Sequence, residues 1–172
     1  MANNRYLYLI KQLHNLNIYD GVVVDCGCGD GNGSKLLIEN GFDDIHSFDI
    51  SDEAISRCRD NGVKAQKGNI TKMPLDDNFA DIFICSETLE HLNTKESSVA
   101  IMKIKRICKQ DGCICITVSE NKEQCLKGAG HKQYFTKQDL LDHFFPLEVA
   151  FEGVFCKKPG KCNLVLIFIN DK

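Results

Sequence analysis

A glycine-rich turn that follows an acidic residue contains the first residues of the chain with an evident capacity for ligand chemistry. The segment reads Asp25-Cys26-Gly27-Cys28-Gly29-Asp30-Gly31 and comes directly after an apolar run. Glycines supply a backbone that adopts positive φ and approaches a ligand closely. A second acid, Asp49, lies 20 residues beyond Gly29, where a carboxylate can accept hydrogen bonds from both ribose hydroxyls. Together these residues predict a nucleotide-type cofactor site.

The spacing within the turn separates two classes of cofactor. A dinucleotide fingerprint requires glycine or alanine three residues after the second glycine, whereas this chain has Asn32 at that distance from Gly29. Asp25 would repel a pyrophosphate but would attract an ammonium group. The turn therefore favours a cofactor that carries an amino acid over NAD.

A second set of reactive side chains lies further along the chain, in Glu87, Glu90, His91 and the distant His131. Carboxylates and imidazoles of this kind act as general bases, and two of each can also hold Mg²⁺ or Mn²⁺. A structural alternative is that Glu90 and His91 begin a helix or shape a pocket wall. The sequence alone leaves these alternatives open.

Alternating strands and helices are expected to position both sets. Apolar periodicity and capping residues predict helices over 3–16, 34–40, 53–61 and 95–109, and strands over 22–26, 45–50, 63–67, 80–85 and 113–118. Such alternation implies a parallel sheet covered on both faces. Ligands bind such sheets at the carboxyl ends of the strands, which places the site after the first strand.

The C-terminal part of the chain changes character. We expect a helix over 136–144, with Thr136 as its N-cap and Asp139 completing a capping box, and then two strands over 147–155 and 162–170. The short turn over 157–161 predicts an antiparallel hairpin. The expected fold is a three-layer α/β sandwich in a single domain over residues 1–172, with residues 1–20 as an N-terminal helix packed on the core.

Several motifs in order make the chain resemble the class I, Rossmann-like S-adenosylmethionine-dependent methyltransferases over roughly residues 20–170. They are Asp25 to Gly31, Phe48-Asp49-Ile50, Gly68-Asn69-Ile70 before Met73-Pro74-Leu75, Phe79-Ala80-Asp81-Ile82-Phe83, Glu87-Thr88-Leu89-Glu90-His91-Leu92, and Arg106 to Cys113. The resemblance implies a mostly parallel seven-stranded sheet with an antiparallel C-terminal strand. It also implies methyl transfer from S-adenosylmethionine, with S-adenosylhomocysteine as the product.

The resemblance assigns a role to individual residues. It implies that Asp25 holds the methionine ammonium, that Asp49 holds the ribose and that Ile50 packs on adenine. Asn69 stands where the family usually has an aspartate that contacts the adenine amino group. The remaining implied cofactor residues are Gly27, Cys28 and Gly29 in the cradle, Ile70 beside the adenine, and Ser86 along the methionine portion.

Three functions remain open for the region after the fourth strand. A small-molecule acceptor, with Glu87, His91 and His131 as catalytic residues and no metal, is the interpretation that we carry forward. Because Glu87, Glu90, His91 and His131 resemble the metal-binding set of Hen-type RNA 2′-O-methyltransferases, a metal-assisted RNA enzyme is the first alternative. A non-catalytic module that binds the cofactor is the second.

Composition narrows the partners. The 21 basic and 24 acidic residues give a net charge of −3, which provides no overall field for nucleic acid or for an anionic membrane. Ten cysteines without a Cys-x-x-Cys pair and without a signal peptide predict reduced thiols and a cytoplasmic protein. No apolar run approaches the ~20 residues of a membrane span. The oligomeric state does not follow from the sequence.

Overall fold

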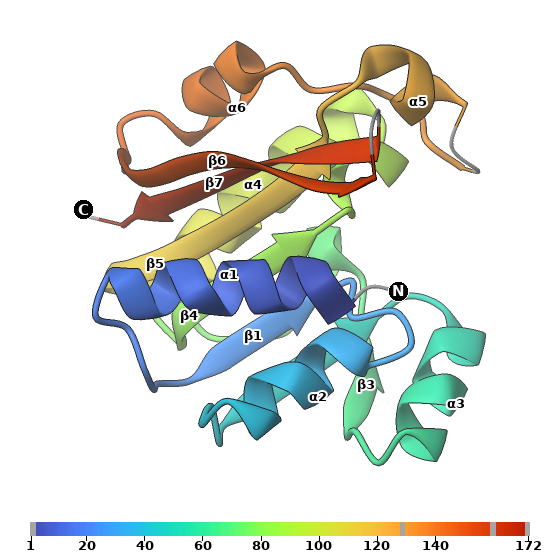
Figure 1. The fold of residues 1–172 in the computed structure, drawn as a ribbon, viewed down its shortest axis with the longest axis vertical. Coiled ribbons are helices and arrows are strands. Elements are labelled where there is room, and N and C mark those ends of the chain that lie inside the picture. The colour runs from blue at the N-terminus through green and yellow to red at the C-terminus, as the bar shows by residue number, and fades with distance from the viewer. Residues whose placement is uncertain (1–2, 128–129, 159–160, 171–172) are drawn as a thin grey trace.

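One seven-stranded sheet forms the centre of the fold in the computed structural model, which describes residues 3–127, 130–158 and 161–170 (Figure 1). The strand order is β3-β2-β1-β4-β5-β7-β6. The strands are β1 (Val23–Cys26), β2 (Ile45–Asp49), β3 (Ala65–Lys67), β4 (Ala80–Ser86), β5 (Cys108–Ser119), β6 (Glu148–Lys158) and β7 (Lys161–Ile169). Neighbours among β1 to β5 pair in parallel, and β7 is antiparallel to both β5 and β6. The expected fold class is confirmed.

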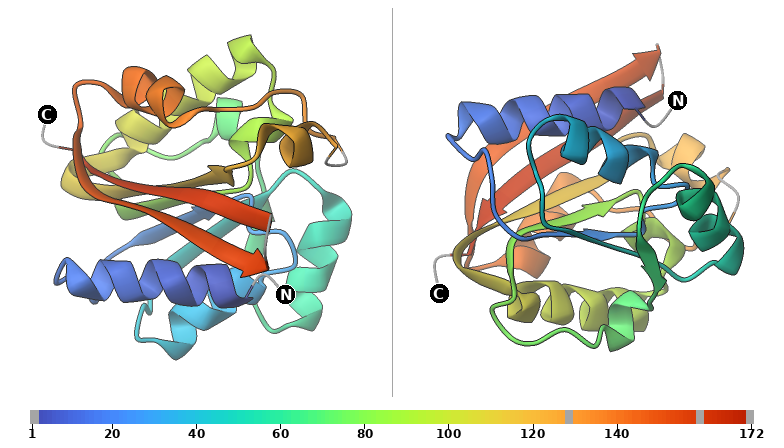
Figure 2. Two further views of the ribbon diagram at one scale, coloured as in Figure 1. Left: turned by 45° about the horizontal axis from the view of Figure 1, so that its top comes forward. Right: turned by 90° about the horizontal axis from the view of Figure 1, so that it is seen from below.

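Helices cover both faces of this sheet. The helical elements are α1 (Asn3–Asn15), α2 (Asn32–Glu39), α3 (Asp52–Asp60), η1 (Ile70–Lys72), η2 (Leu89–His91), α4 (Thr94–Ile107), α5 (Lys122–Leu126) and α6 (Lys137–Phe144). Figure 2 shows α1 and α2 on one side of the sheet and α4 on the opposite side. Within the described ranges no helix combines the length and the apolar character needed to cross a bilayer.

Alternation along each strand divides the apolar residues between two cores, because successive side chains point to opposite faces. On β1, Val23 packs with α1 and α2 whereas Val24 packs with the layer that contains α4 and α6. Asp25 is in step with Val23, so its carboxylate lies under α1. The strand register therefore buries Asp25, one of the predicted site residues, beneath α1.

A glycine brings α1 close to α2. A side chain at Gly33 would meet the Tyr6 ring, which lies 2.4 Å from the ideal Cβ position. With no Cβ there, the Tyr6 ring packs against α2 and its hydroxyl reaches Asp25 in the core. The N-terminal helix is therefore docked against the sheet next to the glycine turn.

Several element boundaries differ from the expected ones. Helix α2 begins at Asn32 rather than at residue 34, because the Asp30 carboxylate accepts a hydrogen bond from the Asn32 backbone and starts the helix at once. Strand β5 begins at Cys108, inside the range expected to be helical. The capping box of Thr136 and Asp139 and the hairpin of β6 and β7 are confirmed. Helix α5 and the 3-10 helix η1 were not expected, whereas the 3-10 helix η2 contains Glu90 and His91, which one alternative placed in a helix.

The cysteines are of two kinds. Eight are free and buried, as expected of small apolar side chains in strands and helices. Cys156 and Cys162 face each other across the hairpin and form a disulfide, with Cα atoms 4.0 Å apart. The expectation of reduced thiols is therefore wrong for this pair, because the sequence did not place the two residues opposite each other in the strand register.

Candidate active site

The glycine turn lies at the carboxyl end of β1, and two of its glycines are needed for different reasons. Gly27 has φ +82°, and a Cβ there would lie 2.0 Å from the Thr88 hydroxyl. Gly29 has φ +59° and no atom within 4 Å of its ideal Cβ position, so it borders open space. Gly27 thus permits close packing of β1 against the loop after β4, whereas Gly29 leaves room for a ligand.

Asp49 at the end of β2 holds this turn in place. Its Oδ2 atom accepts a hydrogen bond from the Gly29 backbone nitrogen at 2.9 Å, and its Oδ1 atom accepts one from the Ser51 nitrogen at 2.9 Å. The Ser51 hydroxyl in turn accepts a hydrogen bond from the Ala54 nitrogen and caps α3. The carboxylate thus connects the turn to the start of α3.

A pocket of about 570 Å³ opens beside the turn. We call it the glycine-turn pocket; its lining residues are Cys26, Gly27, Gly29, Asp49, Ile50, Gly68, Asn69, Ile70, Thr71, Glu87, Thr88, His91, Leu92, Glu96 and Lys132. Its volume lies within the range of about 300–1,000 Å³ that small-molecule sites occupy. Ile50 is 63% exposed there, which is unusual for an isoleucine and provides an apolar surface for a flat ligand.

Six of the nine predicted cofactor residues line this pocket, namely Gly27, Gly29, Asp49, Ile50, Asn69 and Ile70. Asp25, Cys28 and Ser86 are not among its lining residues. Cys28 packs against Cys58 and Val63 beneath the turn. Ser86 is buried, bonded to the Thr117 hydroxyl at 2.9 Å and to Arg5 Nε at 2.8 Å.

Asp25 is a buried anchor in this structure. It is fully buried, and its two carboxylate oxygens accept hydrogen bonds from the Tyr6 hydroxyl and the Ser34 hydroxyl, each at 2.6 Å. Burial raises the pKa of Asp25, and the hydrogen bonds from Ser34 and Tyr6 oppose that rise. Its carboxylate stabilises the turn from the α1 side rather than facing the glycine-turn pocket.

Asn69 combines pocket lining with a structural role. Its Oδ1 atom accepts hydrogen bonds from the Thr71 backbone nitrogen at 2.9 Å and from the Thr71 hydroxyl at 2.8 Å. These bonds cap the η1 turn. Because a carbonyl oxygen has two lone pairs, this oxygen is already satisfied.

Glu87 stands at the other wall of the pocket, directly after β4. Its backbone has φ +54°, an uncommon conformation for a residue with a side chain. Asn163 Nδ2 donates a hydrogen bond to its Oε1 atom at 2.6 Å, and Arg5 lies 3.7 Å from its Oε2 atom. Residues from β7 and α1 therefore hold one carboxylate at the pocket wall.

Glu90 is completely buried, and neither of its carboxylate oxygens has a hydrogen-bond partner among the described residues. Burial and the Glu87 carboxylate raise its pKa to about 8. A buried carboxyl without a cation beside it is expected to remain protonated near neutral pH. Glu90 does not line the glycine-turn pocket, whereas its neighbours Glu87 and His91 do.

The two predicted histidines lie together. The ring centroids of His91 and His131 are 4.5 Å apart and the rings are nearly perpendicular. His91 Nδ1 lies 3.2 Å from the Gly130 carbonyl oxygen, and because that oxygen only accepts, Nδ1 carries the proton. The Cys125 sulfur lies 3.4 Å from His131 Nδ1. The backbone nitrogen of Lys132 donates to the Glu90 carbonyl at 2.8 Å and fastens this segment to η2.

His131 lines a second hollow of about 520 Å³, which we call the basic hollow. Its other lining residues are Arg5, Glu87, Ser119, Lys127, Lys157, Lys161, Cys162 and Asn163. Glu87 lines both this hollow and the glycine-turn pocket. The predicted catalytic residues Glu87, His91 and His131 thus lie where the two cavities adjoin.

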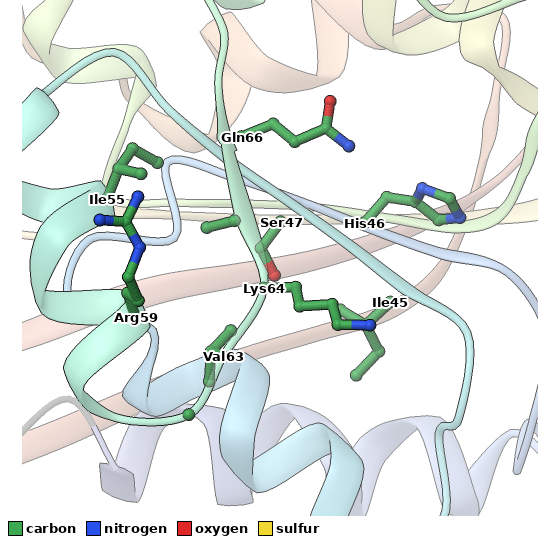
Figure 3. A pocket seen from close by; sticks show the side chains of 10 residues that line it. Ile45, His46, Ser47, Ile55, Arg59, Val63, Lys64 and Gln66 are labelled. Atoms are coloured by element: carbon green, nitrogen blue, oxygen red, sulfur yellow. The ribbon is translucent and has the colours of Figure 1, made fainter.

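A third hollow, of about 580 Å³, lies beside β2 and β3 and holds none of the predicted site residues (Figure 3). His46, Arg59, Lys64 and Gln66 are among its lining side chains.

Within the described residues, no group of three or more histidine, cysteine or acidic side chains is placed to hold a metal ion.

Three residues at the site were not found by sequence reasoning. Tyr6 had a weak signal, because a tyrosine on the apolar face of a helix needs a partner for its hydroxyl. Asn163 had one too, as a polar residue inside an apolar strand. Arg5 had none, since its contact with Ser86 depends on how α1 docks.

Comparison with known proteins provides independent information about the chain. A family model described as a methyltransferase domain matches residues 24–116. The uncharacterised protein MJ0638 of Methanocaldococcus jannaschii is 34% identical over 121 residues, which make up 69% of this chain and 48% of the relative. The chain therefore spans about half the length of that curated relative.

Solved structures share the fold at low identity. One comes from a complex between the Haloferax volcanii Trm112 methyltransferase activator and a methyltransferase, with a TM-score of 0.83, 16% identity and coverage of 99% of this chain and 92% of that chain. Another is the N-methyltransferase NodS of Bradyrhizobium japonicum WM9 with S-adenosyl-L-homocysteine, with a TM-score of 0.81, 16% identity and coverage of 98% and 87%. At such low identities the likeness shows the shared fold alone.

Proposed function

Because the chain belongs to the methyltransferase-domain family, we propose that it transfers a methyl group from S-adenosylmethionine to a small-molecule acceptor. The observation that carries this proposal is the glycine-turn pocket, which opens at the carboxyl ends of β1 and β2. In an open α/β sheet this is the expected position of a nucleotide ligand.

The residues of the glycine-turn pocket fit the cofactor. Open space at Gly29 leaves room for its methionine portion, Asp49 would accept hydrogen bonds from ribose, and the exposed Ile50 would pack on adenine. The Asn69 oxygen is occupied by Thr71, so we propose that the Asn69 amide nitrogen donates to an adenine ring nitrogen instead. Asp25 would act through the shape of the turn, because Tyr6 and Ser34 occupy its oxygens.

When bound, the cofactor supplies a methyl group that is already electrophilic because it is attached to a positively charged sulfur. The protein then has to align an acceptor atom with that methyl group and exclude water. We assign the alignment to Glu87, His91 and His131, which lie between the two cavities. We assign to His91 Nε2, the ring nitrogen that does not contact Gly130, the role of accepting a proton from the acceptor.

Calorimetry with S-adenosylhomocysteine tests the cofactor site. We expect Gly29→Ala to weaken binding at least about tenfold, because the new methyl group enters the ligand space. Gly62→Ala is the matched control, since Gly62 also has positive φ and open space but is not part of the glycine-turn pocket. Equal affinity in both variants would overturn the site assignment.

Asp49→Asn supplies a second measurement. The amide keeps one acceptor oxygen but loses the charge and one of the two hydrogen bonds from Gly29 and Ser51, so binding of S-adenosylhomocysteine should weaken. A labelled-cofactor screen with small acceptors then tests catalysis itself.

The melting temperature measured with and without Mn²⁺, for wild type and for Glu87→Ala, tests the RNA-enzyme alternative. That alternative requires Mn²⁺ to raise the melting temperature of wild type but not of the variant.

A further inference from the structure

The basic hollow, beside the proposed cofactor pocket, has a charge that the chain as a whole does not have. Arg5, Lys127, Lys157 and Lys161 line it, against a single carboxylate from Glu87. The whole chain carries a net charge of −3. Four cations against one carboxylate give this hollow a local positive charge, and a cavity lined mainly by one sign of charge attracts ligands of the opposite sign.

The cations come from separate parts of the chain. Arg5 belongs to α1, Lys127 follows α5, and Lys157 and Lys161 lie at the tip of the hairpin of β6 and β7. The Cys156–Cys162 disulfide joins the two strands beside the hairpin lysines. The fold thus brings three segments to one cavity wall, which a single solvated helix face would not do.

The hairpin lysines have no carboxylate partner within the described part of the chain. Lys127 pairs with Glu123, and Arg5 pairs with Glu87. Lys157 and Lys161 form no such pair there, although both line the same hollow. Like charges in one cavity repel, and an anion bound between them relieves that repulsion.

Other residues that line the hollow carry a different kind of chemical group. Glu87 lies between the basic hollow and the glycine-turn pocket. The buried Glu90 carboxyl lies close enough to Glu87 that burial and the Glu87 carboxylate together raise the pKa of Glu90. His131 also faces the hollow. The cavity therefore has cations on the hairpin side, and Glu87 and His131 on the side toward the proposed cofactor.

We propose that the basic hollow binds the anionic end of the methyl acceptor, a small molecule with a phosphate or carboxylate group at one end and the accepting atom at the other. This inference rests on the proposed function. Lysine ammonium groups bind phosphate and carboxylate as point charges. An acceptor held in this way has its accepting atom directed at Glu87 and the glycine-turn pocket.

Binding of inorganic phosphate and of citrate to the full chain tests the proposal by calorimetry at low salt. We expect both to bind wild type, and the double variant Lys157→Gln, Lys161→Gln to bind them at least about tenfold more weakly. Lys64→Gln is the matched control, because Lys64 is an exposed lysine that lines the hollow of Figure 3 instead. Equal losses in the control and the double variant, or no loss in either, would overturn the proposal.

A second measurement separates this inference from the proposed function. S-adenosylhomocysteine should bind the double variant as tightly as wild type, since neither lysine lines the glycine-turn pocket. Normal binding of S-adenosylhomocysteine without any anion binding contradicts the acceptor site alone. Failure of wild type to bind S-adenosylhomocysteine contradicts the proposed function.

An RNA oligonucleotide is the third probe. If it binds through the hairpin lysines when phosphate and citrate do not, the acceptor is RNA and the small-molecule assignment is overturned.

Discussion

The glycine turn and the hairpin tip border adjoining cavities, but they are built in different ways. The turn is a continuous segment in which backbone conformation sets the shape, with positive φ at Gly27, Gly29 and Gly31. The hairpin region combines side chains from α1, the loop after β4, the segment before α6, and β6 and β7. One region is local in sequence and the other is assembled by tertiary packing.

This difference explains why the donor is easier to infer than the acceptor. A local turn leaves a readable pattern, because only certain residues adopt its backbone conformation. An assembled cavity leaves no contiguous motif, and its residues are free to change without altering the fold. The four variants below test how far the two regions depend on separate interactions.

Gly27→Ala should have the largest effect. A Cβ at positive φ costs about 1–2 kcal/mol, and the clash with Thr88 adds an overpacking cost of about 1–3 kcal/mol. Urea denaturation measures the free energy of unfolding. Gly41→Ala has the same sign of φ but open space, so it should show only the smaller backbone cost; similar losses in both variants would mean that the contact with Thr88 is unimportant.

Glu90→Gln should change the pH dependence of stability. The pKa of Glu90 is raised by burial and by Glu87, so its protonated form stabilises the fold fully below the unfolded-state pKa, and that stability is lost as pH rises toward about 8. Each pH unit in this window removes up to about 1.4 kcal/mol. Denaturation at pH 5, 6 and 7 should therefore show the variant gaining on wild type. A constant difference across this range would contradict the raised pKa.

Tyr6→Phe should lower the free energy of unfolding by removing support for the glycine turn on its α1 side. The substitution removes the hydroxyl that donates to Asp25 and leaves a buried carboxylate with one fewer donor, at a cost of about 1.5 kcal/mol. Thermal and urea unfolding measure the loss. Tyr19→Phe is the control, because Tyr19 is 54% exposed. An unchanged stability in Tyr6→Phe would show that Asp25 does not depend on α1.

Asn163→Ala should have the smallest effect on stability, about 1 kcal/mol, because it removes one partly buried hydrogen bond to Glu87. We expect binding of S-adenosylhomocysteine to stay within about twofold of wild type, since Asn163 lies in the hairpin region. A large loss of cofactor affinity would instead indicate that the two regions are tightly coupled through Glu87.

Most of the fold could be predicted from the sequence. The order of strands and helices, the antiparallel hairpin and the family resemblance are confirmed, because apolar periodicity and local caps determine them. The boundary between α4 and β5 was wrong. Pairing of Cys108 with Ala80 extends β5 toward its start, and this tertiary contact overrides the helical pattern.

The candidate site could be predicted only in part. The side chains of Asp49, Ile50 and Asn69 lie at the expected pocket because they follow strand ends in a parallel sheet. Asp25 could not be placed from spacing alone, since its burial depends on the strand register and on Tyr6 and Ser34. The lysines of the basic hollow gave no signal, because they are distant in sequence.

The hairpin of β6 and β7 has an implication for redesign. Its base is part of the central sheet through β7, whereas its tip is closed by the Cys156–Cys162 disulfide and carries Lys157 and Lys161. Because the sheet holds the base of the hairpin and the disulfide joins its two strands near the tip, the residues between the two cysteines can be replaced without changing the rest of the hairpin. If the hairpin lysines bind the acceptor as proposed, other sequences grafted between the two cysteines should change which acceptor is bound and leave the glycine-turn pocket unaltered.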